Sequence, residues 1–182
     1  MKAPIIVVEY NSQWPSIFEK EKRLILTAIG NKIIQIEHIG STAVPGLGAK
    51  PIIDIMVGVR KLVEIKDLIK PMIDLGYEYI KEHEKEIPER RFFTKRSKYK
   101  GSTHHLHMVE ITSEFWRRHL IFRDYLRFNP DTAEKYYKLK KNLETKYRNH
   151  REAYTEAKTV FIQLIIERAF SQLSDSAQFI LD

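Results

Sequence analysis

One carboxylate, Asp54, interrupts a strand-like run of apolar residues at positions 52–59. Because side chains alternate along a strand, Asp54 should leave the sheet on the face opposite to its apolar neighbours. Those neighbours are Ile53, Ile55, Val57 and Val59. A carboxylate in such a strand needs a compensating partner, and either a divalent cation or a nearby basic side chain would serve. We therefore predict that Asp54 is a catalytic residue and a metal ligand, with a structural ion pair as the alternative.

The loop before this strand predicts a phosphate-binding site. Its first residues, Gly40, Ser41 and Thr42, follow a β-branched run at 33–39, and small side chains allow backbone N–H groups to approach an anion. Ser41 and Thr42 also supply hydroxyl groups. Capping of the loop by the same hydroxyls is the alternative. The adjacent His38 is expected to be a buried histidine bonded to the backbone.

Two histidines, His105 and His107, lie two residues apart in a predicted strand at 104–111 and therefore share a face. If the apolar sides of this strand and of the strand at 52–59 share one core, both histidines emerge on the same side as Asp54. That arrangement predicts a mixed Asp and His metal site. Imidazole would favour zinc, manganese or iron, whereas a carboxylate with phosphate oxygens would favour magnesium. The predicted cofactor is a divalent cation, magnesium or manganese, with zinc as a further candidate.

Basic side chains near these motifs can neutralise a phosphate. We assign this role to Lys50, Arg91 and Arg123, with pairing of Arg123 to Asp124 or to a helix terminus as the alternative. The chain has neither the glycine–lysine–serine loop of P-loop enzymes nor the glycine fingerprint of dinucleotide-binding folds. A kinase or a Rossmann enzyme is therefore not indicated.

The segment EHIGSTAVPGLGAKPIIDI resembles the signature of the GrpB family, a branch of the nucleotidyltransferase superfamily that is sometimes fused to a dephospho-coenzyme A kinase. The likeness continues through RRFFTK, HHLHMVE and FRDYLR to about residue 169. In that superfamily, Gly-Ser precedes a strand with Asp, any residue, and Asp or Glu. Gly40-Ser41 and Asp54 fit this pattern, but Met56 stands where the second carboxylate is expected. The resemblance implies binding of a nucleoside triphosphate and a cation beside Asp54, with nucleotidyl transfer to a small acceptor.

The elements that must position these residues alternate between helix and strand up to about residue 113 and are helical afterwards. Strands are predicted at 33–39, 52–59, 77–80, 91–94 and 104–111, and residues 5–10 are expected to form a short strand or an extended N-terminal arm. Helices are predicted from Pro15 to Gly30, at 61–75, from Ser113 to Asn129, from Asn129 or Asp131 through the Tyr- and Lys-rich stretch, and at 152–173. The polar segment 81–90 is expected to be a mobile connection, residues 95–103 a basic turn, and residues 171–182 a frayed end. This order predicts one domain, residues 1–182, of the α+β class, with a mixed sheet flanked by helices and a C-terminal helical segment. The resemblance to the GrpB family implies that this fold is nucleotidyltransferase-like.

Composition bounds the class of protein. With 182 residues, of which 43% are hydrophobic, the chain can bury one sizeable core. No apolar run approaches the roughly 20 residues that cross a bilayer, and the N-terminus lacks the pattern of a signal peptide. We therefore expect a cytoplasmic protein with no membrane partner. The absence of cysteine excludes disulfides, thiolate zinc sites and cysteine nucleophiles.

A formal net charge of +7 suggests an anionic partner, and basic residues gather at 81–100 and 135–151. Such segments are typical either of a solvated face or of phosphate binding. The first hypothesis is an enzyme that binds a nucleoside triphosphate and a cation beside Asp54. The second is a non-catalytic module that binds a nucleotide or another anionic small molecule, which Met56 favours. Nucleic-acid binding is not expected, because little more than the charge of these segments supports it.

Overall fold

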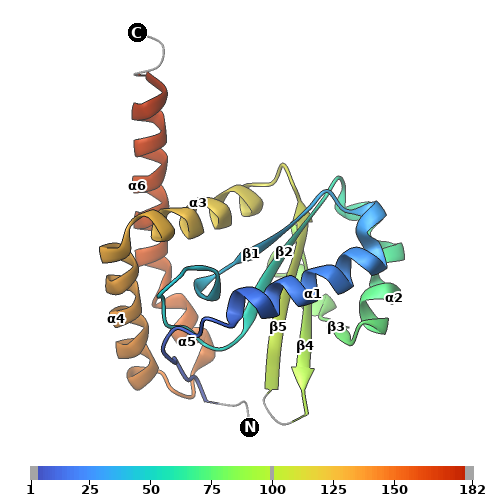
Figure 1. The fold of residues 1–182 in the computed structure, drawn as a ribbon, viewed down its shortest axis with the longest axis horizontal. Coiled ribbons are helices and arrows are strands. Elements are labelled where there is room, and N and C mark those ends of the chain that lie inside the picture. The colour runs from blue at the N-terminus through green and yellow to red at the C-terminus, as the bar shows by residue number, and fades with distance from the viewer. Residues whose placement is uncertain (1–3, 99–100, 179–182) are drawn as a thin grey trace.

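The computed structural model describes residues 4–98 and 101–178, which build one five-stranded mixed sheet with helices around it (Figure 1). The strands are β1 (Gln35–Ile39), β2 (Ile53–Val59), β3 (Tyr77–Tyr79), β4 (Arg90–Ser97) and β5 (Gly101–Glu110). Their order in the sheet is β1-β2-β5-β4-β3. Strands β2 and β5 are parallel, and the other neighbours are antiparallel. The predicted α+β class with a mixed sheet is confirmed.

In the described part of the chain, six α-helices and four short 3-10 helices connect and cover the strands. The α-helices are α1 (Trp14–Ile29), α2 (Lys66–Asp74), α3 (Glu114–Phe128), α4 (Pro130–Lys146), α5 (Arg151–Glu156) and α6 (Thr159–Gln178). The 3-10 helices are η1 (Gly30–Lys32), η2 (Ser41–Ala43), η3 (Leu62–Glu64) and η4 (Lys81–Glu84). Helices α4, α5 and α6 stand together on the side of the molecule remote from α2 (Figure 1). Within the described ranges, no helix combines the length and the apolar character needed to cross a membrane.

The alternation predicted for β2 decides which face of the sheet carries the site. Ile53, Ile55 and Val57 are buried in the main core, which α1 and α2 cover. The opposite face carries Met56, which packs against Trp116 of α3. Helix α3 begins where predicted, because the Ser113 side chain accepts a hydrogen bond from the backbone N–H of Trp116 at 3.2 Å. The face with Asp54 therefore points toward α3 and the C-terminal helices.

Near the chain ends, the structure decides one prediction and changes another. Residues 5–10 are the extended arm rather than the short strand: Ile5 and Val7 are buried against α4 and α5, and within the described residues Val8 forms an isolated bridge with Ala49. The predicted helix at 152–173 is two helices, α5 and α6, with a break after Glu156.

The middle of the chain also differs from the predicted boundaries. Helix α2 begins at Lys66 and contains Pro71, after the separate 3-10 helix η3. The predicted basic turn is shorter, because β4 continues to Ser97 and β5 begins at Gly101. The polar segment after β3 forms η4 at its start. Residues 99–100 of the predicted turn and 179–182 of the predicted frayed end lie outside the described residues.

Candidate functional site

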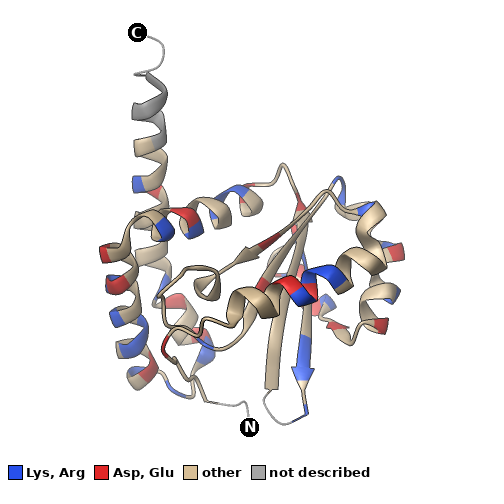
Figure 2. Cartoon of the chain, viewed as in Figure 1, with Lys and Arg blue, Asp and Glu red and all other residues tan. Residues whose placement is uncertain are grey.

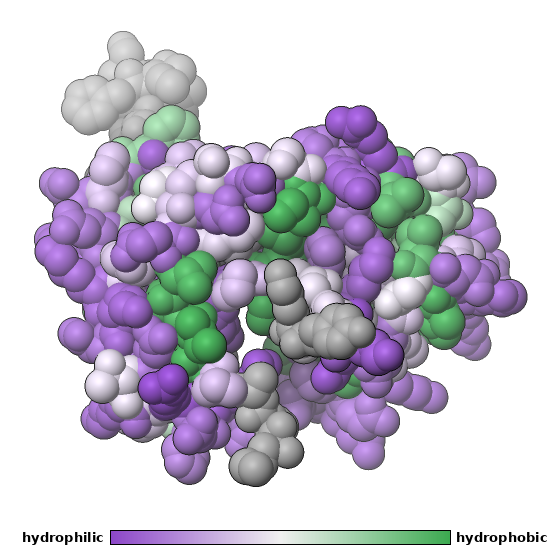
Figure 3. All heavy atoms as spheres, turned by 60° about the horizontal axis from the view of Figure 1, so that its bottom comes forward, coloured by the Kyte–Doolittle hydropathy of each residue, from purple (hydrophilic) through white to green (hydrophobic). Residues whose placement is uncertain are grey.

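A cavity of about 760 Å³ lies between the Asp54 face of the sheet and the C-terminal helices. The space-filling view shows a face of the molecule that is hollowed near its centre (Figure 3). Seven of the predicted site residues line the cavity: Gly40, Ser41, Thr42, Lys50, Asp54, His105 and His107. A second, smaller hollow of about 420 Å³, beside α2, contains none of them. The larger cavity is therefore the candidate site.

Asp54 is held as a carboxylate inside this cavity. It lies opposite His105 in the pairing of β2 and β5, and its Oδ1 atom is 3.3 Å from Nδ1 of His105. Burial by itself would raise the pKa of Asp54, but the hydrogen bond from His105 and the nearby charge of Lys50 hold that pKa below its usual value. The Asp54 side chain keeps 29% of its surface exposed, so a ligand can reach it. The predicted alternative of a simple Lys or Arg ion pair is not the arrangement found.

Gly40 packs directly against this carboxylate. Its φ is +70°, and a Cβ atom added to it would lie only 2.5 Å from Oδ2 of Asp54. Position 40 therefore needs glycine for two reasons, the left-handed backbone and the close approach of a side chain.

Replacing Gly40 with alanine is expected to destabilise the fold by more than the roughly 1–3 kcal/mol that a strained backbone conformation costs. The Gly40 φ of +70° and ψ of −173° lie in a region essentially restricted to glycine, and the new methyl group also displaces Asp54. Gly46 is a matched control, since its φ is +77° but a Cβ atom there would meet open space. Chemical denaturation of both variants measures the difference. Equal losses for Gly40→Ala and Gly46→Ala would show that the contact with Asp54 is not tight.

The two loop hydroxyls have different roles. Thr42 is buried, and its Oγ1 atom lies 3.0 Å from Nε2 of His38, so this hydroxyl caps the loop, as the predicted alternative held. His38 is buried as predicted, but its partner is a side chain rather than the backbone. Burial lowers the pKa of His38 to about 4, so its ring is neutral. Ser41 is half-buried at the cavity and hydrogen-bonded to Tyr136 of α4.

His107 lies opposite Met56, two residues further along each strand than the Asp54–His105 pair and on the same face of the sheet. Burial lowers the pKa of His107 well below its usual value, so the imidazole is neutral. Met56 is fully buried beside Phe115 and Trp116. A carboxylate at position 56 would lie among these rings, at a high cost in desolvation. The position of the expected second carboxylate is therefore part of an apolar cluster in this chain.

Three lysines from distant parts of the chain converge on the cavity: Lys50 from the loop before β2, Lys140 from α4, and Lys158 from the junction of α5 and α6. The Nζ atoms of Lys50 and Lys158 lie 5.2 and 4.5 Å from the centre of the Tyr154 ring. Lys140 is only 3% exposed and donates to the carbonyl oxygen of Gly48. Within the described residues, no carboxylate lies within ion-pair distance of these three ammonium groups.

Without a bound anion, the proximity of these three ammonium groups disfavours their charged forms. Burial, together with the charges of Lys158 and Lys50, lowers the pKa of Lys140 to about 7. Burial and the charge of Lys50 likewise lower the pKa of Lys158 to about 8. Burial also lowers the pKa of Lys50, although the charge of Asp54 opposes this effect. These side chains would regain a full positive charge if an anion entered the cavity.

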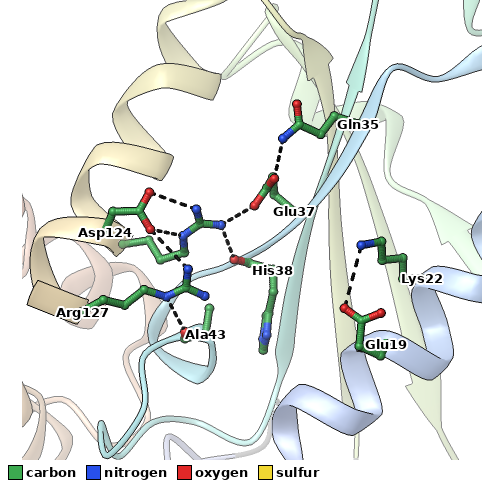
Figure 4. Close-up of polar contacts among 9 residues, drawn as sticks. Glu19, Lys22, Gln35, Glu37, His38, Ala43, Asp124 and Arg127 are labelled. Atoms are coloured by element: carbon green, nitrogen blue, oxygen red, sulfur yellow. Dashed lines mark hydrogen bonds and ion pairs between the residues drawn. The ribbon is translucent and has the colours of Figure 1, made fainter.

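Two predicted phosphate ligands are placed elsewhere, and both predictions are corrected. The Arg123 guanidinium is buried away from the cavity, where it pairs with Glu37, the carbonyl oxygen of His38, and Asp124. These three partners are labelled in Figure 4. Arg123 joins α3 to β1, which agrees with the predicted alternative of pairing with Asp124. Arg91 donates to the carbonyl oxygen of Pro88 and pairs with a carboxylate of η4. Both arginines are therefore already neutralised by the protein.

Sequence reasoning missed Lys140, Lys158 and Arg90, which do line the cavity. Figure 2 shows blue and red residues interspersed along α4, which favours reading its lysines as a solvated face. Yet the buried residues of α4 include Ala133, Tyr136, Lys140 and Leu143, spaced at three and four residues. The position of Lys140 on the apolar stripe of this helix was the signal in the sequence that could have indicated its burial.

These features define an α+β domain with a cationic cavity beside a Gly-Ser loop and a strand carboxylate. The chain belongs to the GrpB family, because the family model described as GrpB protein matches residues 4–168. It is 38% identical over 168 residues to the Glutamate-rich protein GrpB of Alkalihalophilus pseudofirmus, across 91% of this chain and 95% of that protein. The crystal structure of conserved protein GrpB from Enterococcus faecalis is similar with a TM-score of 0.82 and 36% identity, across 92% of this chain and 99% of that one.

A Dephospho-CoA kinase of Mycolicibacterium paratuberculosis is also similar, at 25% identity across 93% of this chain. The match spans only 47% of that longer protein. The predicted membership of the GrpB family is confirmed.

Proposed function

We propose that the cavity binds the phosphates of a nucleoside triphosphate or of another anionic small molecule. The observation that carries this proposal is the convergence of Lys50, Lys140 and Lys158, without carboxylate partners among the described residues, in one cavity with Asp54. A buried cation needs a counter-charge, and a polyphosphate would satisfy all three ammonium groups at once. The half-buried Ser41 adds a hydroxyl group on the same wall.

The donors beside Asp54 fit some divalent cations and not others. Among the described residues, no group of three or more His, Cys, Asp or Glu side chains is placed to hold a metal ion. A zinc site would require at least three protein ligands, so zinc does not fit. Magnesium or manganese needs only one or two carboxylates together with water and substrate phosphates, and Asp54 fits that role. Such a cation, when bound, would withdraw charge from the transferring phosphate.

Two versions of this function differ in whether a nucleotidyl group is transferred to an acceptor. Asp54 and the lysines are compatible with transfer, whereas the apolar surroundings of Met56 favour a module that binds the ligand without reacting. Incubation with labelled triphosphates, magnesium and a metabolite mixture separates the two. Release of pyrophosphate would support a transferase, and tight binding without release would support the module. Binding of neither a triphosphate nor any anion of the mixture would contradict both versions.

Replacing Lys140 with methionine is expected to weaken binding of inorganic tripolyphosphate at least tenfold, since a charge-assisted contact contributes about 1.5–3 kcal/mol. Folding should survive, because methionine has a suitable length and removes a buried charge. Lys138→Met is the matched control, since Lys138 lies on the same helix but is exposed and paired with Glu134. Isothermal titration calorimetry would measure both variants. If the two variants bind tripolyphosphate equally well, Lys140 is not a phosphate ligand.

Binding should also depend on pH with a definite sign. Lys140 and Lys158 have pKa values of about 7 and about 8, so both lose their charge as the pH rises from 7 to 9. The affinity for a polyphosphate that is fully ionised over this range should therefore fall at least tenfold between pH 7 and pH 9. The dependence should be shallower in Lys140→Met. An affinity that stays constant over this range would contradict the assigned charges.

A further inference from the structure

The proposed phosphate site uses only one end of the cavity, and the other end has no role yet. We call it the Arg90 pocket and define it by Arg90 and Phe92 of β4, His107 of β5, and Phe115 and His119 of α3, all of which line the cavity. The Arg90 guanidinium lies over the rings of Phe92 and Phe115, 5.1 and 5.9 Å from their centres. The wall of this pocket is therefore aromatic, with one cation held against it.

Arg90 lacks the partner that a half-buried arginine normally has. Its only side-chain hydrogen-bond contact among the described residues is with His83, where NH2 lies 3.3 Å from Nδ1. Its Nε atom is buried without a partner, and within the described ranges no carboxylate is close enough to form an ion pair with it. Burial accordingly lowers the pKa of Arg90. A cation in this state indicates that a ligand supplies hydrogen-bond acceptors.

The local charge distinguishes this pocket from the lysine end. The cavity lining near Arg90 includes one further arginine and three acidic residues: Arg118, Glu86, Glu89 and Glu114. The lysine end has three cations against the single carboxylate of Asp54. A second strongly anionic group is therefore not favoured at Arg90, whereas an uncharged group with acceptor atoms is. The two ends meet at His105, which contacts both Asp54 and the Phe92 ring.

We propose that the Arg90 pocket binds a nucleobase, while the phosphates of the same ligand reach the lysines. This inference rests on the proposed function and assigns the other end of that ligand. The rings of this wall are already stacked in pairs, Phe92 on His83 and Phe115 on His119. A base can extend such a stack, and the guanidinium fork of Arg90 donates to acceptor atoms on a base edge. The cavity volume of about 760 Å³ suits a whole small-molecule ligand, for which pockets of about 300–1,000 Å³ are usual.

The test compares the magnesium complexes of four nucleoside triphosphates (A, G, C and U) with inorganic tripolyphosphate, by calorimetry on the full chain. At least one nucleotide should bind the parent protein tenfold or more tightly than tripolyphosphate. Arg90→Gln and Phe92→Leu should each remove that advantage and leave the affinity for tripolyphosphate within twofold. Arg96→Gln is the matched control, because Arg96 lies on the same strand but is exposed and paired with Glu78. It should keep the full advantage.

Each contrary result has a distinct meaning. If the parent protein binds tripolyphosphate as tightly as every nucleotide, the nucleobase pocket is disproved while the phosphate site stands. If Arg90→Gln and Phe92→Leu both fold and keep the parent's preference, the pocket has been assigned to the wrong residues. If the parent binds neither kind of ligand, both the nucleobase pocket and the assignment of the lysines to a polyphosphate fail.

Discussion

Replacing Arg123 with methionine is expected to lower the free energy of unfolding by about 2–4 kcal/mol, because breaking a buried ion pair leaves the remaining charge buried without a partner. Arg123 bonds the Glu37 carboxylate, the carbonyl oxygen of His38 and the Asp124 carboxylate. The Glu37 side chain is only 21% exposed, so solvent could not fully replace the guanidinium. Asp124 is more exposed than Glu37, so the loss of its ion pair should cost less free energy. Urea denaturation measures the change.

Arg127→Met is the matched control for this prediction. Arg127 lies one turn further along α3, donates to the carbonyl oxygen of Ala43 at 3.0 Å, and is more exposed than Arg123. Its replacement should cost about 1 kcal/mol. Under conditions in which Arg123→Met is folded, its affinity for tripolyphosphate should equal that of the parent. If Arg123→Met kept the stability of the parent but no longer bound tripolyphosphate, Arg123 would be a phosphate ligand after all.

Replacing Ile55 with alanine is expected to cost about 2–5 kcal/mol, since Ile55 is fully buried in the main core and its loss leaves a cavity. The affinity for tripolyphosphate should change little at a temperature where the variant is folded. The reason is that Ile55 points to the face of β2 opposite the cavity. Thermal and urea unfolding, followed by titration of the folded variant, measure both quantities.

Asp54→Asn is the counterpart of Ile55→Ala on the neighbouring residue. Because the pKa of Asp54 is held below its usual value, its charge stabilises the fold above pH 4, and this contribution fades as the pH falls below about 4. The amide should therefore cost about 1 kcal/mol at neutral pH, less than Ile55→Ala, while binding of a magnesium–triphosphate complex weakens at least tenfold. If Asp54→Asn unfolds as readily as Ile55→Ala, or binds the complex as well as the parent, Asp54 is structural.

Short-range patterns predicted the part of the site that lies close together in the sequence. The alternation in β2 placed Ile55 in the core and Asp54 on the other face, and the same rule placed His105 and His107 together. That rule would also have excluded Arg91, since it shares a strand face with Phe93, which is fully buried in the main core.

The lysine end could not be predicted in this way, because it depends on how distant helices pack. Lys140 and Lys158 come from segments about a hundred residues after the Gly-Ser loop, and only the tertiary fold brings them beside Lys50. The burial of Met56 has the same origin, since it follows from the position of α3 over β2. Local sequence does not determine which helix covers which strand.

The most direct test of the phosphate site is a crystal structure of the protein with a nonhydrolysable nucleoside triphosphate and magnesium, at a concentration shown by calorimetry to saturate binding. Our account predicts electron density for the phosphates in the 760 Å³ cavity, in contact with Lys50, Lys140 and Lys158 and next to Asp54. Saturated protein with an empty cavity, or with the phosphates bound at another surface, would contradict it.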